Sequence, residues 1–137
     1  KHLLTFERGG RYAPPLLQAL ARLTAQAPRD PVLQARLRRE AIALEALQAL
    51  EMKAMRGAGG SAALYASVLK VSGTEAAQRI DVLACDIAGL SGWCVADGQT
   101  ADHVAVAVPR YLNDRAASIY AGSNEIQRDL IARQLLA

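Results

Sequence analysis

The chain has 137 residues, of which 52% are hydrophobic and only 4% aromatic, and its formal net charge is +3. This length fits one domain, and an Ala- and Leu-rich composition with few aromatic residues favours packed helices over a β-sandwich. No apolar run reaches the roughly 18 residues of a membrane span, and the basic run at Arg36, Arg38 and Arg39 has no interleaved aromatic residues, which argues against nucleic-acid binding.

The opening segment, Lys1 to Arg8, is apolar at several positions and has no helix-start signal, so we expect the chain to be part of a longer protein. Gly9-Gly10 and Pro14-Pro15 then interrupt the helical pattern, because proline lacks the backbone donor and clashes with the preceding turn. Leu16 to Ala27 is helical again, and the local chemistry predicts a break before it.

Two long helices are predicted in the middle of the chain. Asp30-Pro31 is a good start for the first, which the glycines at 57–60 end; its buried face is Leu33, Leu37, Ala41, Leu44 and Leu47. Ser61 caps the second, which has two apolar stripes and therefore lies centrally in a bundle or faces a second subunit. Gly73 weakens this helix and indicates close backbone packing.

The C-terminal third is predicted as an extended loop followed by two helices. Gly89 to Val108 is irregular, and Pro109 begins a fourth long helix that carries Leu112 and Ile119. A turn at Gly122 leads into a short last helix capped by Ser123. The fold prediction is one all-α domain over 1–137, an up-down four-helix bundle with a short extra C-terminal helix.

Cysteine and histidine usage points to no metal site. Cys85 and Cys94 lack the spacing of metal ligands, and His2 and His103 stand alone,. Free thiols fit a reducing compartment, so a cytoplasmic location is expected.

The most specific pattern lies near the C-terminus. The order Ile-Tyr-x-Gly-Ser-Asn-Glu-Ile-Gln-Arg-x-x-Ile-Ala resembles the C-terminal signature of acyl-CoA dehydrogenases,. The matching residues are Ile119, Tyr120, Gly122, Ser123, Asn124, Glu125, Ile126, Gln127, Arg128, Ile131 and Ala132. The resemblance covers nearly the whole chain but only the last part of the family's, whose N-terminal helical and middle β-domains are absent here.

This resemblance implies an FAD-dependent α,β-dehydrogenation of an acyl-CoA thioester. A carboxylate in an apolar pocket removes the α-proton while the β-hydrogen leaves as hydride to the flavin. In the commonest branch the base lies between the Tyr and Gly of the signature, where this chain has Ala121. In another branch it is the Glu of a Glu-Arg pair, here Glu7-Arg8. The resemblance therefore implies Glu7 as catalytic base and Arg8 as its electrostatic neighbour; a purely structural Glu-Arg pair is the alternative.

The resemblance also implies flavin contacts at two places. Gly122, Ser123 and Glu125 match positions that approach flavin in relatives, although helix capping explains them equally. Gly89 and Gly92 remain from the family's Gln-x-x-Gly-Gly-x-Gly loop, which binds flavin across a dimer. The Gln and the double Gly are missing, and the Arg-x-x-Phe-Gly element has no counterpart.

An electron-transfer flavoprotein as electron acceptor and a homodimer or homotetramer are further implications of the resemblance. The isolated domain is expected to be inactive, because flavin and acyl chain normally lie between this bundle and the β-domain. Two alternatives remain open: a non-catalytic oligomerisation or partner-binding module, and a relative of acyl-CoA oxidase or nitroalkane oxidase.

Overall fold

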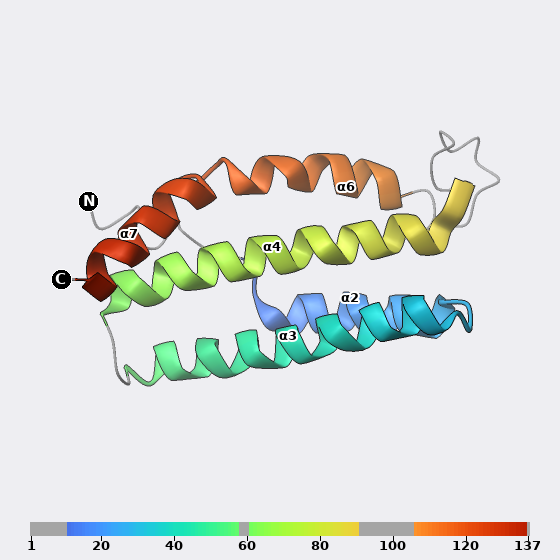
Figure 1. The fold of residues 1–137 in the computed structure, drawn as a ribbon, viewed down its shortest axis with the longest axis horizontal. Coiled ribbons are helices and arrows are strands. Elements are labelled where there is room, and N and C mark those ends of the chain that lie inside the picture. Colours follow the sequence, from blue (N-terminus) through green and yellow to red (C-terminus); the bar gives the residue numbers. More distant parts are fainter. Residues whose placement is uncertain (1–10, 58–60, 91–105, 137) are drawn as a thin grey trace.

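A computed structural model describes residues 11–57, 61–90 and 106–136. Over these ranges the chain forms helices and no strand: α2 (Ala13–Gln26), α3 (Pro31–Met55), α4 (Ala62–Ala88), α6 (Ala107–Arg115), the 3-10 turn η2 (Ala116–Ser118) and α7 (Asn124–Leu136). Helices α2, α3, α4 and α6 alternate in direction along the bundle, and α7 continues beyond η2 at one end (Figure 1). The predicted all-α bundle with an extra C-terminal helix is confirmed.

The helix starts follow local side-chain chemistry. Asp30 accepts hydrogen bonds from the backbone N–H groups of Val32 and Leu33, and Ser61 accepts one from Leu64. Both caps satisfy backbone donors that a helix start leaves without partners. Helix α2 begins at Ala13, and Pro14 and Pro15 follow directly in its first turn. Proline is tolerated there because backbone N–H groups in the first turn make no hydrogen bond within the helix.

The apolar core lies between α2, α3 and α4. Its α3 members are four of the five residues predicted for that helix, and Ala41 packs against them half-buried. The core cluster is Ala13, Leu16, Leu20, Leu33, Leu37, Leu44, Leu47, Ala76, Ala77, Ile80 and Leu83. Helix α4 also packs against α6 and α7, so the prediction that it lies centrally in the bundle is confirmed.

The segment before α2 crosses α4 in close contact with its backbone. A Cβ built on Gly73 would lie 2.2 Å from the carbonyl oxygen of Arg11, so only glycine leaves room for this crossing. The Arg11 side chain pairs with Asp114 on α6, and the N–H of Ala13 donates to Glu51 Oε1 on α3 at 2.8 Å. Contacts with three helices therefore fix this segment, and the close packing predicted at Gly73 is confirmed.

The C-terminal helices differ from the prediction in their apolar faces. Helix α6 begins at Ala107 rather than Pro109 and ends at Arg115. Leu112 and Ile119, which were expected to lie on this fourth helix, are 60% and 71% exposed, and Ile119 follows η2 instead of lying in α6. The buried residues of α7 are Asn124 and Gln127, both polar, because α7 meets a polar face of α4.

The structure also bears on the predictions about the basic run in α3 and about membrane-spanning segments. Arg36, Arg38 and Arg39 lie on the exposed side of α3, as a solvated helix face requires. Across the described ranges, every helix is too short or too polar to cross a bilayer.

Candidate functional site

The signature residues form a sharp corner between η2 and α7, which we call the corner and define as residues 120–123. The N–H groups of Ile119 and Tyr120 donate to the carbonyl oxygen of Ala116, at 2.9 and 3.1 Å. Ala121 and Gly122 then have φ angles of +57° and +87°, and these two left-handed residues reverse the chain into α7. Ala121 is the only described non-glycine residue in this conformation.

Glycine at 122 is required by space as well as by its backbone angle. A Cβ there would lie 2.5 Å from Nε2 of Gln127, which is 1% exposed and lies beneath the corner. Ser123 then caps α7: its Oγ accepts from the N–H of Ile126 at 3.4 Å. The capping role predicted for Ser123 is therefore observed.

The carboxylate nearest the corner is not suited to accept a proton. Hydrogen bonds from the Glu125 backbone N–H and the Ser123 hydroxyl lower the pKa of Glu125, and the positive charges of Arg128 and Lys70 act in the same direction. Glu125 is exposed at the α7 N-terminus, where the helix dipole also favours a negative charge,. It can orient or repel a ligand, but it is a poor general base at neutral pH.

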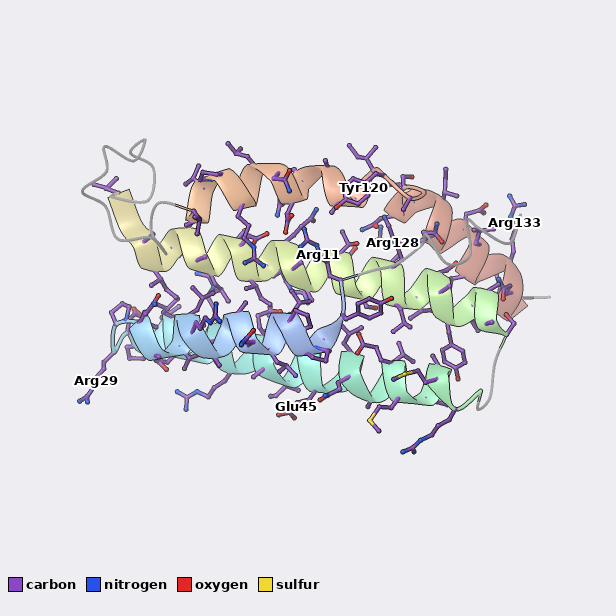
Figure 2. All side chains as sticks on the ribbon, turned by 180° about the vertical axis from the view of Figure 1, so that it is seen from behind. Arg11, Arg29, Glu45, Tyr120, Arg128 and Arg133 are labelled. Atoms are coloured by element: carbon purple, nitrogen blue, oxygen red, sulfur yellow. The ribbon has the colours of Figure 1, made fainter. Side chains whose placement is uncertain are left out.

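Backbone donors at the corner are available to a ligand. The N–H groups of Ala121, Gly122 and Ser123 donate to no other described residue. They precede the positive end of α7, a place that suits a partly negative oxygen. Tyr120 is half-exposed beside them, between α6 and α7 (Figure 2). These donors fit the carbonyl oxygen of a thioester or a polar atom of a cofactor.

The predicted cofactor residues fall into two groups that lie far apart along the bundle. Gly122, Ser123 and Glu125 lie at the start of α7, which contacts α4 at Lys70, whereas Gly89 caps the C-terminal end of α4 with a φ of +57° (Figure 1). The stretch of α4 from Lys70 to Gly89 separates them by roughly 28 Å, so one chain cannot bring both groups to one flavin ring. Gly92, Glu7 and Arg8 lie outside the described residues.

A second buried polar cluster lies farther along α4. Asp81 and Asp114 are each 1% exposed. Arg110 Nε lies 3.1 Å from Asp81 Oδ1, and Arg11 pairs with Asp114. Burial and a hydrogen bond with Asp114 raise the pKa of Asp81 to about 7. A cavity of about 360 Å³ opens beside Asp81 and Arg110, but no corner residue lines it.

Metal binding finds no support among the residues that the structure describes. No group of His, Cys, Asp and Glu side chains there has the arrangement of a metal site. Cys85 is a buried free thiol, and burial raises its pKa. A protonated, enclosed thiol is unreactive.

The sequence-based interpretation missed the polar face of α4. Ser67, Lys70, Thr74 and Asp81 recur at helical spacing and are all buried. Their partners are Asn124 for Lys70 and Arg110 for Asp81, which lie far away in the sequence. Their helical spacing indicated that they share one face of the helix. It did not indicate that this face is buried, because charged residues are usually exposed and their distant partners cannot be identified from a single sequence.

Two comparisons with known proteins point to the same family. Residues 15–136 match the family described as "Acyl-CoA dehydrogenase, C-terminal domain". The chain is 36% identical over 142 residues to the acyl-CoA dehydrogenase IpdE1 of Mycobacterium tuberculosis (strain ATCC 25618 / H37Rv). That alignment covers 97% of this chain but only 36% of the relative, so the chain spans about a third of that protein's length.

Proposed function

The chain belongs to the acyl-CoA dehydrogenase family, and on this premise we propose that it supplies the helical C-terminal domain of an FAD-dependent dehydrogenase acting on acyl-CoA thioesters. The observation that carries the proposal is the corner itself. It combines backbone donors that have no partner among the described residues, a methyl side chain at Ala121 and a neighbouring carboxylate, Glu125, that is held ionised. Such a corner can bind a carbonyl oxygen, and it needs a base from elsewhere.

We assign that base to Glu7, with Arg8 as its electrostatic neighbour. In one branch of the family the base is the Glu of a Glu-Arg pair, and in this chain Glu7-Arg8 comes a few residues before Arg11, where the chain crosses α4. The Glu7 carboxylate takes the proton from the α-carbon of the thioester. The corner N–H groups stabilise the negative charge that then develops on the carbonyl oxygen.

FAD, when bound, supplies the acceptor for the hydride that leaves the β-carbon, so the products are a trans-2-enoyl thioester and reduced flavin. Gly122, Ser123 and Glu125 would contact it on one side, and Gly89 and Gly92 would contact the flavin of a second subunit. The free donors at the corner and the polar first turn of α7 are consistent with such a group. The separation of roughly 28 Å between the two groups fits contacts across a homodimer or homotetramer.

The same proposal places the whole protein in the cytoplasm, with an electron-transfer flavoprotein as its electron acceptor. It also predicts that the isolated domain has no activity. The buried free thiol of Cys85 supports a reducing compartment,. None of the residues discussed so far separates a dehydrogenase from an oxidase that passes electrons to oxygen. Reoxidation of the reduced flavin by air within the turnover time would identify it.

A non-catalytic helical module is the second candidate, and the methyl at Ala121 favours it. Exposed apolar residues on the outer helices, such as Leu112, Ile119 and Leu135, would then serve oligomerisation or partner binding,.

The deciding experiment uses the full-length protein that carries this chain. Bound flavin is detected by its visible absorbance and is expected to bleach when an acyl-CoA is added. Glu7→Gln should bind flavin but bleach slower by a factor of at least about 100, because the base is lost. Exposed Glu45→Gln is the matched control and should bleach at the normal rate. No flavin, or no bleaching with any acyl-CoA, would favour the non-catalytic module, and unchanged bleaching in Glu7→Gln would overturn the base assignment.

A further inference from the structure

Lys70 lies buried on the face of α4 that meets α7. It is 2% exposed, and its Nζ donates to Oδ1 of Asn124 at 2.6 Å. Asn124 is itself 3% exposed and is the first residue of α7, directly after the corner. One hydrogen bond thus connects the middle of the bundle to the point where the corner becomes a helix.

The surroundings of this contact are polar as well as buried. Ser67, one turn before Lys70, is fully buried, and its Oγ has no hydrogen-bond partner among the residues that the structure describes. Gln127, one turn after Asn124, is 1% exposed, and its Oε1 also lacks a partner within the described ranges. Because the Gln127 amide occupies the space that a Cβ on Gly122 would need, this cluster contacts the corner directly.

A buried ammonium is a costly way to join two helices. Apolar side chains of the same size dock helices as well or better, since no charge is removed from water. An exposed ion pair between Arg128 and Glu75 already joins α7 to α4 (Figure 2). Helix docking therefore does not require Lys70, and its position under the corner points to another role.

We propose that Lys70 is a positioning residue for the corner, acting through Asn124. This rests on the proposed function, in which the backbone donors of Ala121 and Gly122 bind the substrate's carbonyl oxygen. Lys70 fixes the first residue of α7, and that residue fixes the direction of the donors before it. Burial lowers the pKa of Lys70, and the negative charge of Glu125 partly offsets this effect, so Glu125 favours the charged form of the ammonium beneath the corner.

The first test compares three methionine variants of the full-length protein. Lys70→Met should lower the rate of flavin reduction by acyl-CoA about tenfold to a hundredfold, since a misplacement of about 1 Å costs that much, with little change in KM. Lys53→Met, on an exposed lysine of α3, should leave the rate unchanged. Arg128→Met removes the exposed Arg128–Glu75 ion pair between α7 and α4 and should also keep the rate. An equal loss in Arg128→Met, or none in Lys70→Met, overturns the proposal.

Variants of the partner separate positioning from stability. Asn124→Asp retains an acceptor for Lys70 and should keep the rate near that of the unmodified protein, whereas Asn124→Leu should lose it. The double variant Lys70→Met/Asn124→Leu replaces both partners by apolar groups, which is nearly neutral for stability. It should recover Tm without recovering the rate. Recovery of both would show that the pair is only structural.

Amide hydrogen exchange provides a readout that does not depend on activity. Lys70→Met should increase exchange at the N–H groups of Ile126 and Gln127, which donate to Ser123 at the start of α7, at least tenfold, and Arg128→Met should not. If Lys70→Met exchanges faster but the full-length protein never reduces flavin, Lys70 positions the corner and the enzymatic function is refuted. Unchanged exchange refutes the role of Lys70 even in an active enzyme.

Discussion

Asp81 on α4 and Asp114 on α6 form a buried pair of acidic side chains inside the bundle, where each residue is 1% exposed. Among the described residues, neither Oδ2 has a hydrogen-bond partner. Burial and the neighbouring Asp114 raise the pKa of Asp81 to about 7, which favours one proton shared by the pair over two buried negative charges,. Arg110 and Arg11 supply two positive charges beside the pair, and the whole cluster joins α6 to α4.

This shared proton predicts a stability that depends on pH. The pKa of Asp81 is about 7 in the folded chain, above its ordinary value of 3.8, so the folded state binds the proton more tightly than the unfolded state does. The resulting stabilisation is complete below pH 4 and is lost as pH rises through about 7. Between pH 5 and pH 8, Tm should fall by several degrees, since about 1 kcal/mol corresponds to roughly 4 °C.

The control is Asp81→Asn, whose amide can donate to Asp114 at every pH. Its Tm should vary less between pH 5 and pH 8 than that of the unmodified chain. Asp86→Asn, an exposed carboxylate of the same helix paired with Arg36, should leave the steep dependence in place. If Asp81→Asn retains the full pH dependence, the shared proton does not reside on this pair.

Close passage of the chain over Gly73 predicts that even one methyl group there is destabilising. In Gly73→Ala the new Cβ would meet the backbone of Arg11, which cannot move aside as a flexible side chain could. Overpacking of this kind costs about 1–3 kcal/mol, and the better helix propensity of alanine returns up to about 1 kcal/mol. Urea unfolding of Gly73→Ala should show a net loss, whereas Ser72→Ala on the same turn should not. Higher stability in Gly73→Ala would contradict the observed crossing.

The left-handed conformation of Ala121 predicts the opposite effect for glycine. A φ of +57° costs an L-residue roughly 1 kcal/mol relative to glycine,. Ala121→Gly should therefore raise the free energy of unfolding, with the gain reduced by the greater flexibility of glycine in the unfolded chain. Ala117→Gly, at a buried helical position with ordinary backbone angles, should lower it. Equal losses in the two variants would mean that residue 121 is not left-handed in solution.

Local chemistry in the sequence was sufficient to predict most of the fold. Asp30, Ser61 and Ser123 cap the helices that they were expected to cap, and the spacing of leucines from Leu33 to Leu47 identified the buried face of α3. These features depend on residues within a few positions of one another, and such short-range rules are reliable.

The candidate site was less predictable because its contacts are long-range. The role of Lys70 depends on Asn124, which lies 54 positions later. Leu112 and Ile119 have the spacing of a buried stripe yet are exposed, because α6 and α7 turn polar residues toward α4. Apolar periodicity could not reveal this, since it assumes that the buried face of each helix is the apolar one.

The methyl at Ala121 predicts that the proton acceptor can be moved. Glu7→Gln should be nearly inactive in flavin reduction by acyl-CoA, and adding Ala121→Glu places a carboxylate where the commonest branch of the family has its base. The double variant should recover at least about tenfold in rate, because glutamate tolerates the same backbone angles as alanine and residue 121 is half-exposed at the corner,. Ala121→Gln in the Glu7→Gln background has the same size without a proton acceptor and should stay inactive. Equal rates for the glutamate and glutamine variants would show that the α-carbon of the substrate does not lie beside this corner.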